Sequence, residues 1–243
     1  MRGRIKTLVC NALQWKDIFL DILFPSTCLY CAKSISSGTA ILCETCMRTI
    51  RVHTTLFCAE CKARLPDGIK TCHKTTPFTL AAVTDYDDAV RSLIHRFKYR
   101  RWSSVMTVFT PLIAKYLEHC TVHADTFTVV PIPLHPDRLR DRGFNQAQLI
   151  AEVVAHTLRR PLRSELLERT RATHAQAELK DWDARAENIA NAFSVPARLS
   201  LENKNIILVD DVYTSGATMR DAARALREAG AKRIIAFVVA KTG

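Results

Sequence analysis

The sequence predicts an α/β fold, in which helices flank a largely parallel sheet, preceded by a small metal-held domain. Two strand-like runs, the uninterrupted apolar residues 206–209 and the mostly apolar residues 127–130, each lead into a loop and then into a helix-patterned segment. This succession is typical of buried parallel strands joined by helical crossovers. A last apolar run, at residues 233–240, has the length of one further strand. The cysteines predict the metal-held domain, because seven of the nine lie between Cys28 and Cys72.

Composition sets the class of protein and its expected surroundings. A chain of 243 residues can bury a full core, and 48% hydrophobic with 24% charged residues is ordinary for a globular protein. No apolar run approaches the roughly 18 residues of a membrane span, and no secretory leader follows the basic N-terminus. We therefore expect no membrane span and a cytoplasmic location. The net charge of +11 favours an anionic partner.

Changes in residue composition and patterning divide the chain into three segments. Residues 1–27 contain an amphipathic helix, with apolar residues along one face, that is halted by Pro25. Residues 28–77 form the cysteine-rich domain, which has too few apolar residues to fold without a metal. Residues 78–243 form the α/β domain.

The first cysteine set is a complete tetrahedral zinc site. Two Cys-x-x-Cys pairs separated by about a dozen residues have the spacing of zinc-ribbon knuckles, and disulfides are unexpected without an export signal. Four thiolates leave no open position for water or substrate, so this zinc is structural. The ligands are Cys28, Cys31, Cys43 and Cys46.

The second cysteine set is one thiolate short. Cys58, Cys61 and Cys72 supply three ligands, whereas Thr75 stands where a fourth knuckle cysteine would fall. His73 could complete a Cys₃His site; otherwise the site is empty or binds metal weakly, because structural zinc is almost always four-coordinate. We therefore expect one zinc ion and leave a second open.

The α/β domain begins with a strand at residues 79–86 and a helix at residues 87–97. From Arg91 to Arg101, cations alternate with aromatic residues, and no acid occurs between Ala89 and Leu117. Single-stranded nucleic acid favours such a mixture, through phosphate contacts and base stacking. The alternative is a basic helix end whose aromatic residues are core and whose cations face solvent or a diphosphate. The residues concerned are Arg91, His95, Arg96, Phe97, Lys98, Tyr99, Arg100, Arg101 and Trp102.

The late strand at residues 206–209 runs into two acids and a hydroxyl-rich turn that opens a helix at residues 219–229. Amide groups at the helix start, the hydroxyls and the helix dipole form an anion cradle, which Gly216 lets a ligand approach closely. Asp210 and Asp211 would accept hydrogen bonds from sugar hydroxyls or hold a Mg²⁺ that bridges to a polyphosphate. The pattern therefore indicates a site for a phosphate ester of a sugar.

Two other classes of protein also place paired acids after an apolar strand. The acid pair of a receiver domain opens that domain, whereas only about 30 residues follow Asp211. A nucleotide hydrolase needs a Gly-rich loop with Lys-Ser/Thr, which this sequence lacks. Neither class fits.

The acid pair and turn resemble the 5-phosphoribosyl-1-diphosphate (PRPP) signature of type I phosphoribosyltransferases. The resemblance implies a type I phosphoribosyltransferase-like parallel sheet flanked by helices, with PRPP accompanied by Mg²⁺. It places Asp210 and Asp211 at the catalytic centre as the ribose-binding acids. In the loop that follows the strand at residues 127–130, Arg138 and Arg142 are candidates for holding the pyrophosphate. The implied 5′-phosphate loop consists of Thr214, Ser215, Gly216, Ala217 and Thr218. Gln176, Arg185 and Asn188 are candidate pocket-lining residues in a hood over the site.

The order of motifs along the chain resembles the ComF family, which includes GntX-type members. The motifs are the cysteine knuckles, residues 94–99 (Ile-His-Arg-Phe-Lys-Tyr), residues 130–134 (Val-Pro-Ile-Pro-Leu), residues 142–147 (Arg-Gly-Phe-Asn-Gln-Ala) and the PRPP signature. The resemblance implies a PRPP-binding protein that assists uptake of single-stranded DNA in natural transformation, with competence and DNA-uptake proteins as partners. Two alternatives are an active phosphoribosyltransferase for a small base or amine, and a PRPP-sensing regulator that binds nucleic acid.

Overall fold

The structure, a computed structural model, describes residues 27–35, 40–66, 72–73, 76–98, 102–120, 127–171 and 191–243. The amphipathic helix expected within residues 1–27 and the pocket candidates Gln176, Arg185 and Asn188 lie outside the described residues. The helices are α2 (Glu44–Thr49), α3 (Asp88–Phe97), α4 (Trp102–His119), α5 (Pro136–Arg142), α6 (Gln146–Leu158) and α8 (Ala217–Glu228), with the short 3-10 helix η1 (Ser164–Leu166). The strands are β1 (Leu56–Cys58), β2 (Arg64–Leu65), β3 (Thr79–Asp85), β4 (Phe127–Pro131), β5 (Glu168–Arg169), β6 (Phe193–Ser194), β7 (Asn205–Tyr213) and β8 (Arg233–Lys241).

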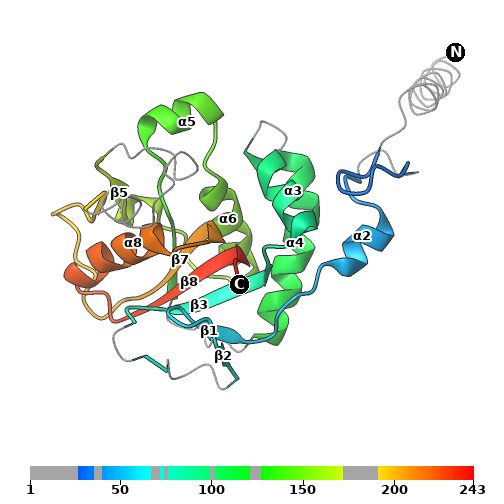
Figure 1. The fold of residues 1–243 in the computed structure, drawn as a ribbon. Coiled ribbons are helices and arrows are strands. Elements are labelled where there is room, and N and C mark those ends of the chain that lie inside the picture. The colour runs from blue at the N-terminus through cyan, green and yellow to red at the C-terminus, as the bar shows by residue number, and fades with distance from the viewer. Residues whose placement is uncertain are drawn as a thin grey trace, which may run out of the picture.

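The main sheet has six strands in the order β2-β1-β3-β8-β7-β4 (Figure 1). The strands β3, β8, β7 and β4 are parallel, so their carboxyl ends share one edge, whereas β1 runs antiparallel to both β2 and β3. At the shared edge, Tyr213 of β7 pairs with Lys241 of β8, which in turn pairs with Asp85 of β3. The prediction of an α/β fold with a mostly parallel sheet is confirmed.

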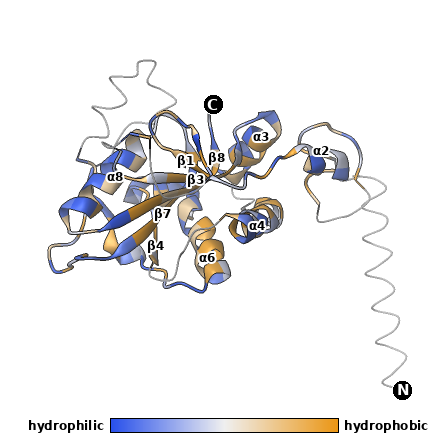
Figure 2. Cartoon of the chain, turned by 90° about the horizontal axis from the view of Figure 1, so that it is seen from below, coloured by the Kyte–Doolittle hydropathy of each residue, from blue (hydrophilic) through white to orange (hydrophobic). Residues whose placement is uncertain are grey.

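Alternate residues of β7 enter two separate cores. Ile207 and Val209 pack with residues of α3, α4 and α6, whereas Ile206 and Leu208 pack with residues of α8. Figure 2 shows α8 on one side of the strands and α4 and α6 on the other. Because both faces of the sheet are covered, the strand is apolar at each of these positions. That burial explains the uninterrupted run at residues 206–209.

The cysteine-rich segment is joined to this sheet. Its strand β1 pairs with β3 through Phe57 and Leu80, and with β2 through Leu56 and Leu65. The hydroxyl of the fully buried Tyr116, on α4, donates a 3.1 Å hydrogen bond to the carbonyl of Thr55. The main sheet therefore extends across residue 77, where the sequence predicts the boundary between the two domains.

The segment after β4, which the sequence predicts to be a loop, contains a short helix, α5. Pro136 takes the first turn, where its missing N–H is not needed, and Gly143 ends the helix with a φ of 78°. Asn145 then caps α6 by accepting from the N–H of Ala147, while its side-chain amide donates to the carbonyl of Ile132 at 3.0 Å. The start of α6 is thus tied to the end of β4.

The ribbon formed by β5 and β6 is held against α8 by one carboxylate. Asp221, which is 8% exposed, accepts hydrogen bonds from the N–H groups of Asn191, Ala192 and Phe193 at 3.0, 2.8 and 3.2 Å. These backbone donors take the place of water around the buried carboxylate. Because Phe193 pairs with Arg169 of β5, this anchor also fixes the position of Arg169.

Candidate functional site

The loop between β7 and α8, residues 214–218, has the geometry of an anion site. Gly216 stands at the N-cap position of α8 with a φ of 74°, so the N-cap residue has no side chain to bond the first turn. The first turn of such a helix presents backbone N–H groups and the positive end of the helix dipole. The N–H of Ala217 donates a 3.4 Å hydrogen bond to the hydroxyl oxygen of Ser215, which is 8% exposed. This segment, the β7–α8 loop, corresponds to the predicted phosphate loop.

The acid pair lies at the carboxyl end of β7, directly before this loop. The carboxylate of Asp210 accepts a 2.8 Å hydrogen bond from the N–H of Asp211, and both side chains are half-buried. Burial and the neighbouring charge of Asp211 raise the pKa of Asp210 to about 8, against an opposing effect from the Lys98 ammonium. A carboxyl group with a raised pKa beside a second acid is typical of a functional site.

An arginine from another element, Arg169 on β5, lies within electrostatic range of Asp210 and of a second arginine, Arg138 on α5. Burial lowers the pKa of Arg169, and so does the charge of Arg138, while Asp210 and Asp221 raise it. Arg138 on α5 and Arg169 on β5 therefore lie close enough to interact with one another across the site. The Arg169 guanidinium also lies over the ring of Phe193, 5.3 Å from its centroid. Arg169 thus relates α5 and β7 electrostatically, through Arg138 on the one and Asp210 on the other.

Arg142, the second predicted arginine, lies four residues after Arg138 on α5 and is half-buried. Residues at this spacing share one face of a helix, so both can face the same ligand. Its role stays a prediction.

Sequence reasoning missed Lys98 and Arg169 as members of this site. Lys98 ends α3 and appeared only within the basic run, whereas Arg169 belongs to a two-residue strand far from any motif. Their proximity to Asp210 depends on contacts between distant parts of the chain. Local spacing carried no signal for either residue.

The basic and aromatic run after β3 is only partly exposed. Phe97 is fully buried and packs edge-on against Phe109, with ring centroids 5.6 Å apart. The interpretation of Phe97 as a base-stacking platform is therefore wrong, because its ring belongs to the core. Arg91 and His95 are exposed on α3, and residues 99–101 lie outside the described part of the chain.

The first cysteine set forms one compact cluster. The sulfur atoms of Cys28, Cys31, Cys43 and Cys46 all lie within 4.8 Å of one another, and each of these cysteines is a free thiol. The Sγ atoms of Cys31 and Cys43 are 3.7 Å apart. Tetrahedral ligands at about 2.3 Å from one zinc ion would be about 3.8 Å apart, which fits this distance.

The second set forms a similar cluster that includes His73. The Nδ1 atom of His73 lies 3.5 Å from Cys58 Sγ, and Cys61 Sγ lies 3.1 Å from Cys72 Sγ. The four ligand atoms lie within 4.8 Å of one another. Cys₃His is a common structural zinc set, so His73 fits the position that Thr75 cannot fill.

The two knuckles share the same backbone conformation. The N–H of Ala32 donates to the carbonyl of Cys28 at 2.9 Å, and the N–H of Lys62 donates to that of Cys58 at 2.8 Å. Ala32 and Lys62 both have a φ of 58°. Because non-glycine residues rarely take this conformation, its repetition indicates the same local requirement in both clusters.

The thiol electrostatics also fit a bound cation. Burial opposes ionisation of Cys28 and Cys58, but backbone N–H groups lower the pKa of each to about 6. The pKa of Cys46 and that of Cys72 are raised to about 12, the first mainly by burial and the second mainly by the neighbouring thiols. Four clustered thiolates repel one another, so full deprotonation requires a metal ion in their midst.

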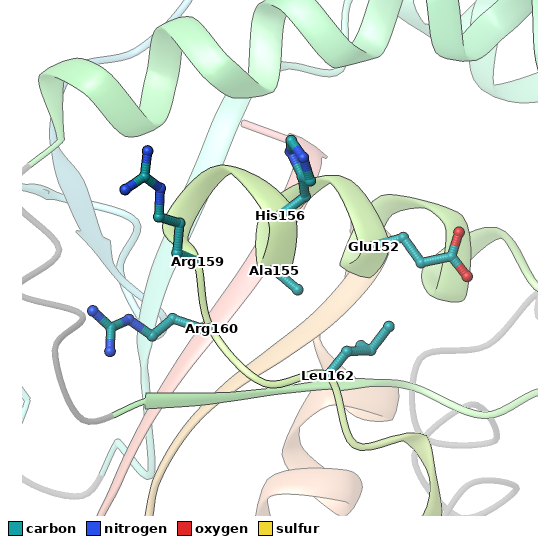
Figure 3. A pocket seen from close by; sticks show the side chains of 6 residues that line it. All are labelled: Glu152, Ala155, His156, Arg159, Arg160 and Leu162. Atoms are coloured by element: carbon teal, nitrogen blue, oxygen red, sulfur yellow. The ribbon is translucent and has the colours of Figure 1, made fainter.

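A groove of about 590 Å³ lies at the C-terminal end of α6, separate from the acid pair (Figure 3). In the close-up, Arg159 and Arg160 extend from the turn that follows the helix, and His156 lies one turn earlier. The groove contains no residue of the β7–α8 loop. Its lining residues are Glu152, Ala155, His156, Arg159, Arg160 and Leu162.

None of the helices in the described part of the chain is both long and apolar enough to cross a membrane.

Two family models match the chain in the regions just described. The double zinc ribbon domain matches residues 19–76, which include both clusters, and the phosphoribosyl transferase domain matches residues 152–243, which include the acid pair and the β7–α8 loop. The fold and site thus define a phosphoribosyltransferase-like protein with a double zinc ribbon.

Relatives of nearly equal length specify the family. The chain is 31% identical to the DNA utilization protein YhgH of Escherichia coli (strain K12) over 90% of this chain and 98% of that protein. It is 29% identical to the competence protein ComFC of Bacillus subtilis (strain 168) over 94% of this chain and 92% of that protein. The chain belongs to the ComF family.

Solved structures align over part of the chain. A purine phosphoribosyltransferase from Pyrococcus horikoshii covers 59% of this chain and 85% of its own, with 16% identity and a TM-score of 0.36. A TM-score this low adds no argument, so the family assignment rests on the sequence matches.

Proposed function

We propose that the carboxyl edge of β7 binds PRPP or a related phosphoribosyl compound. The observation that carries the proposal is the acid pair at the end of β7, with Arg169 in electrostatic range of Asp210, directly before a helix whose N-cap residue is a glycine. A sugar that carries phosphate at both ends is the ligand that offers hydroxyls to acids and anions to cations at once.

Each part of the site then has one task. The amides and hydroxyls of the β7–α8 loop bind the 5′-phosphate, and the acid pair binds the ribose hydroxyls. Arg138, Arg142 and Arg169 hold the pyrophosphate. The carboxylates of Asp210 and Asp211 are hard oxygen ligands of the kind that Mg²⁺ prefers, and Mg²⁺ would neutralise part of the diphosphate charge.

The biological role that we propose is handling of single-stranded DNA in the cytoplasm during natural transformation, together with competence proteins. This role is supported by two relatives, which are named as a DNA utilization protein and a competence protein. The net charge of +11 suits a polyanionic partner. Exposed cations on α3, such as Arg91, contact the phosphates of the DNA backbone, and no base stacks on Phe97.

Turnover of PRPP is the first alternative. In that case an acceptor, a small base or amine, displaces pyrophosphate at the ribose, and the site stabilises charge as it develops. Pyrophosphate release measured across nucleobases and amines separates an enzyme from a binding protein. The second alternative, a PRPP-sensing regulator of duplex DNA, predicts tighter binding to duplex than to single strands at the same salt concentration.

The assignment of the site is tested by the double substitution Asp210→Ala with Asp211→Ala. We expect calorimetry to show loss of PRPP binding in the presence of Mg²⁺, while elemental analysis shows an unchanged zinc content. The matched control is Asp141→Ala, which removes an exposed acid from α5 and leaves binding intact. PRPP binding of ordinary strength by the double variant would overturn the proposal.

A further inference from the structure

The second metal cluster and the β7–α8 loop are joined by one buried side chain. Tyr213, the last residue of β7, is 2% exposed, and its hydroxyl donates a 2.8 Å hydrogen bond to the carbonyl of Ala59. Ala59 lies between Cys58 and Cys61, inside the metal-binding knuckle. The two segments are separated by 154 positions in the sequence.

The loop side of this contact fits closely around the tyrosine. A Cβ atom built on Gly216 would lie 2.4 Å from the Tyr213 hydroxyl oxygen, so the ring occupies the space that a side chain would need. The Arg220 guanidinium donates to the carbonyl of Ser215 at 2.7 Å, which closes the loop from the helix side. A shift of the Tyr213 ring would therefore displace the backbone at Gly216.

The knuckle side of the contact depends on its ligands. Within this knuckle, Cys58 is the last residue of β1, and it pairs with Thr79 of β3. The turn that follows contains Ala59, the exposed Cys61 and Lys62, which has a φ of 58°. Ala59 itself is 4% exposed and lies in the same apolar cluster as Tyr213, whereas Cys61 is exposed and is held chiefly through metal binding. The position of the Ala59 carbonyl is thus set jointly by this packing and by the ligands on either side of it, Cys58 and Cys61.

We propose that Tyr213 is a positioning residue through which metal at Cys58, Cys61, Cys72 and His73 holds the β7–α8 loop in its anion-binding conformation. The second cluster then acts on ligand binding as well as on folding. This inference rests on the proposed function of the loop. The first cluster is outside this relation, because it lies with α2 on the far side of α3 and α4 from the loop (Figure 1).

Hydrogen–deuterium exchange of the full-length protein tests the coupling without any ligand. Cys61→Ser removes one exposed ligand, and we expect the zinc content to fall by one ion and the amides of residues 214–218 to exchange faster. Tyr213→Phe removes only the hydroxyl; it should keep the zinc and produce the same local acceleration. In the same variant, PRPP affinity should fall about threefold to tenfold, as expected for loss of one hydrogen bond.

Two controls separate this effect from general destabilisation. Tyr116→Phe removes a similar bond, from a buried tyrosine hydroxyl to the carbonyl of Thr55, and should leave exchange at residues 214–218 unchanged. Cys31→Ser takes metal from the first cluster and should also leave the loop unchanged.

Each outcome decides one point. If circular dichroism shows that Cys61→Ser is unfolded, Tyr213→Phe alone decides. Unchanged loop exchange in Tyr213→Phe overturns the coupling, whatever the affinity for PRPP. If the loop responds as expected but the wild-type protein binds no PRPP, the coupling stands and the proposed function fails.

Discussion

Gly216 and Tyr213 occupy positions that exclude a side chain on the glycine. An added Cβ would lie 2.4 Å from the tyrosine hydroxyl oxygen, and the φ of 74° already disfavours any other residue. We therefore predict that Gly216→Ala destabilises the protein by about 2 to 4 kcal/mol, because steric overlap adds to the cost of the left-handed backbone. Urea unfolding measures this difference.

Gly143 provides the matched control for this substitution. Its φ of 78° is almost the same, but an added Cβ would meet nothing within 4 Å. Gly143→Ala should therefore cost only about 1 kcal/mol, the backbone part of the effect. Equal losses in the two variants would show that the contact with Tyr213 is unimportant.

Asp210 should lower the stability of the unliganded protein at alkaline pH. Folding raises its pKa to about 8, so the native state holds this proton more tightly than the unfolded state. The free energy of unfolding therefore falls as the pH rises from about 4 to about 8. Asp210→Asn removes this dependence, and we predict a melting temperature at pH 8 about 2 to 4 °C or more above that of the wild type.

Calorimetric melting at pH 5 and pH 8 checks this prediction. The two proteins should differ much more at pH 8 than at pH 5, and Asp141→Asn, on the surface of α5, should behave as the wild type. A stability gain of the same size at both pH values would point to packing instead of ionisation. Greater stability with lost ligand binding is the usual trade-off at a functional site.

The metal content follows from the geometry of both clusters. Because His73 lies with Cys58, Cys61 and Cys72 in a four-ligand set, we predict two zinc ions per chain by elemental analysis. His73→Ala should lower the content to about one ion, since three ligands do not make a closed structural site. Cys120→Ser, which alters a buried thiol outside both clusters, should keep two. One ion in the wild-type protein would show that the second cluster is not a stable site.

Arg169 should contribute to ligand binding although no motif marks it. Its charge interacts with those of Arg138 and Asp210. A bound diphosphate would offset the repulsion between the two arginines, because it is attracted to both. We predict that Arg169→Ala weakens PRPP binding about tenfold or more, the size expected for charge-assisted bonds in a half-buried site. Titration calorimetry with PRPP and Mg²⁺ measures the loss, and Arg163→Ala, at an exposed position before η1, is the control. Equal affinities would remove Arg169 from the site.

Much of the fold could be predicted because the signals are local. The apolar run at residues 206–209, the acids and the hydroxyl-rich turn are consecutive, and the structure shows them as strand, edge and helix start. Asn145 likewise marks the start of α6, whereas the short helix α5 before it was not predicted. The domain boundary predicted between residues 77 and 78 stays a prediction. Strand β1, before this boundary, pairs with β3, after it, so the main sheet contains residues from both sides.

The sequence by itself determined the parallel sheet, the acid pair with its loop, and the first zinc site, because in each case a short run of residues carries the whole signal. Only the tertiary structure decided that His73 completes the second cluster, that Phe97 is core, that Arg169 reaches Asp210, and that Tyr213 joins the knuckle to the loop. These relations depend on which surfaces meet when the sheet and its helices pack. Residue spacing along a chain does not encode that packing.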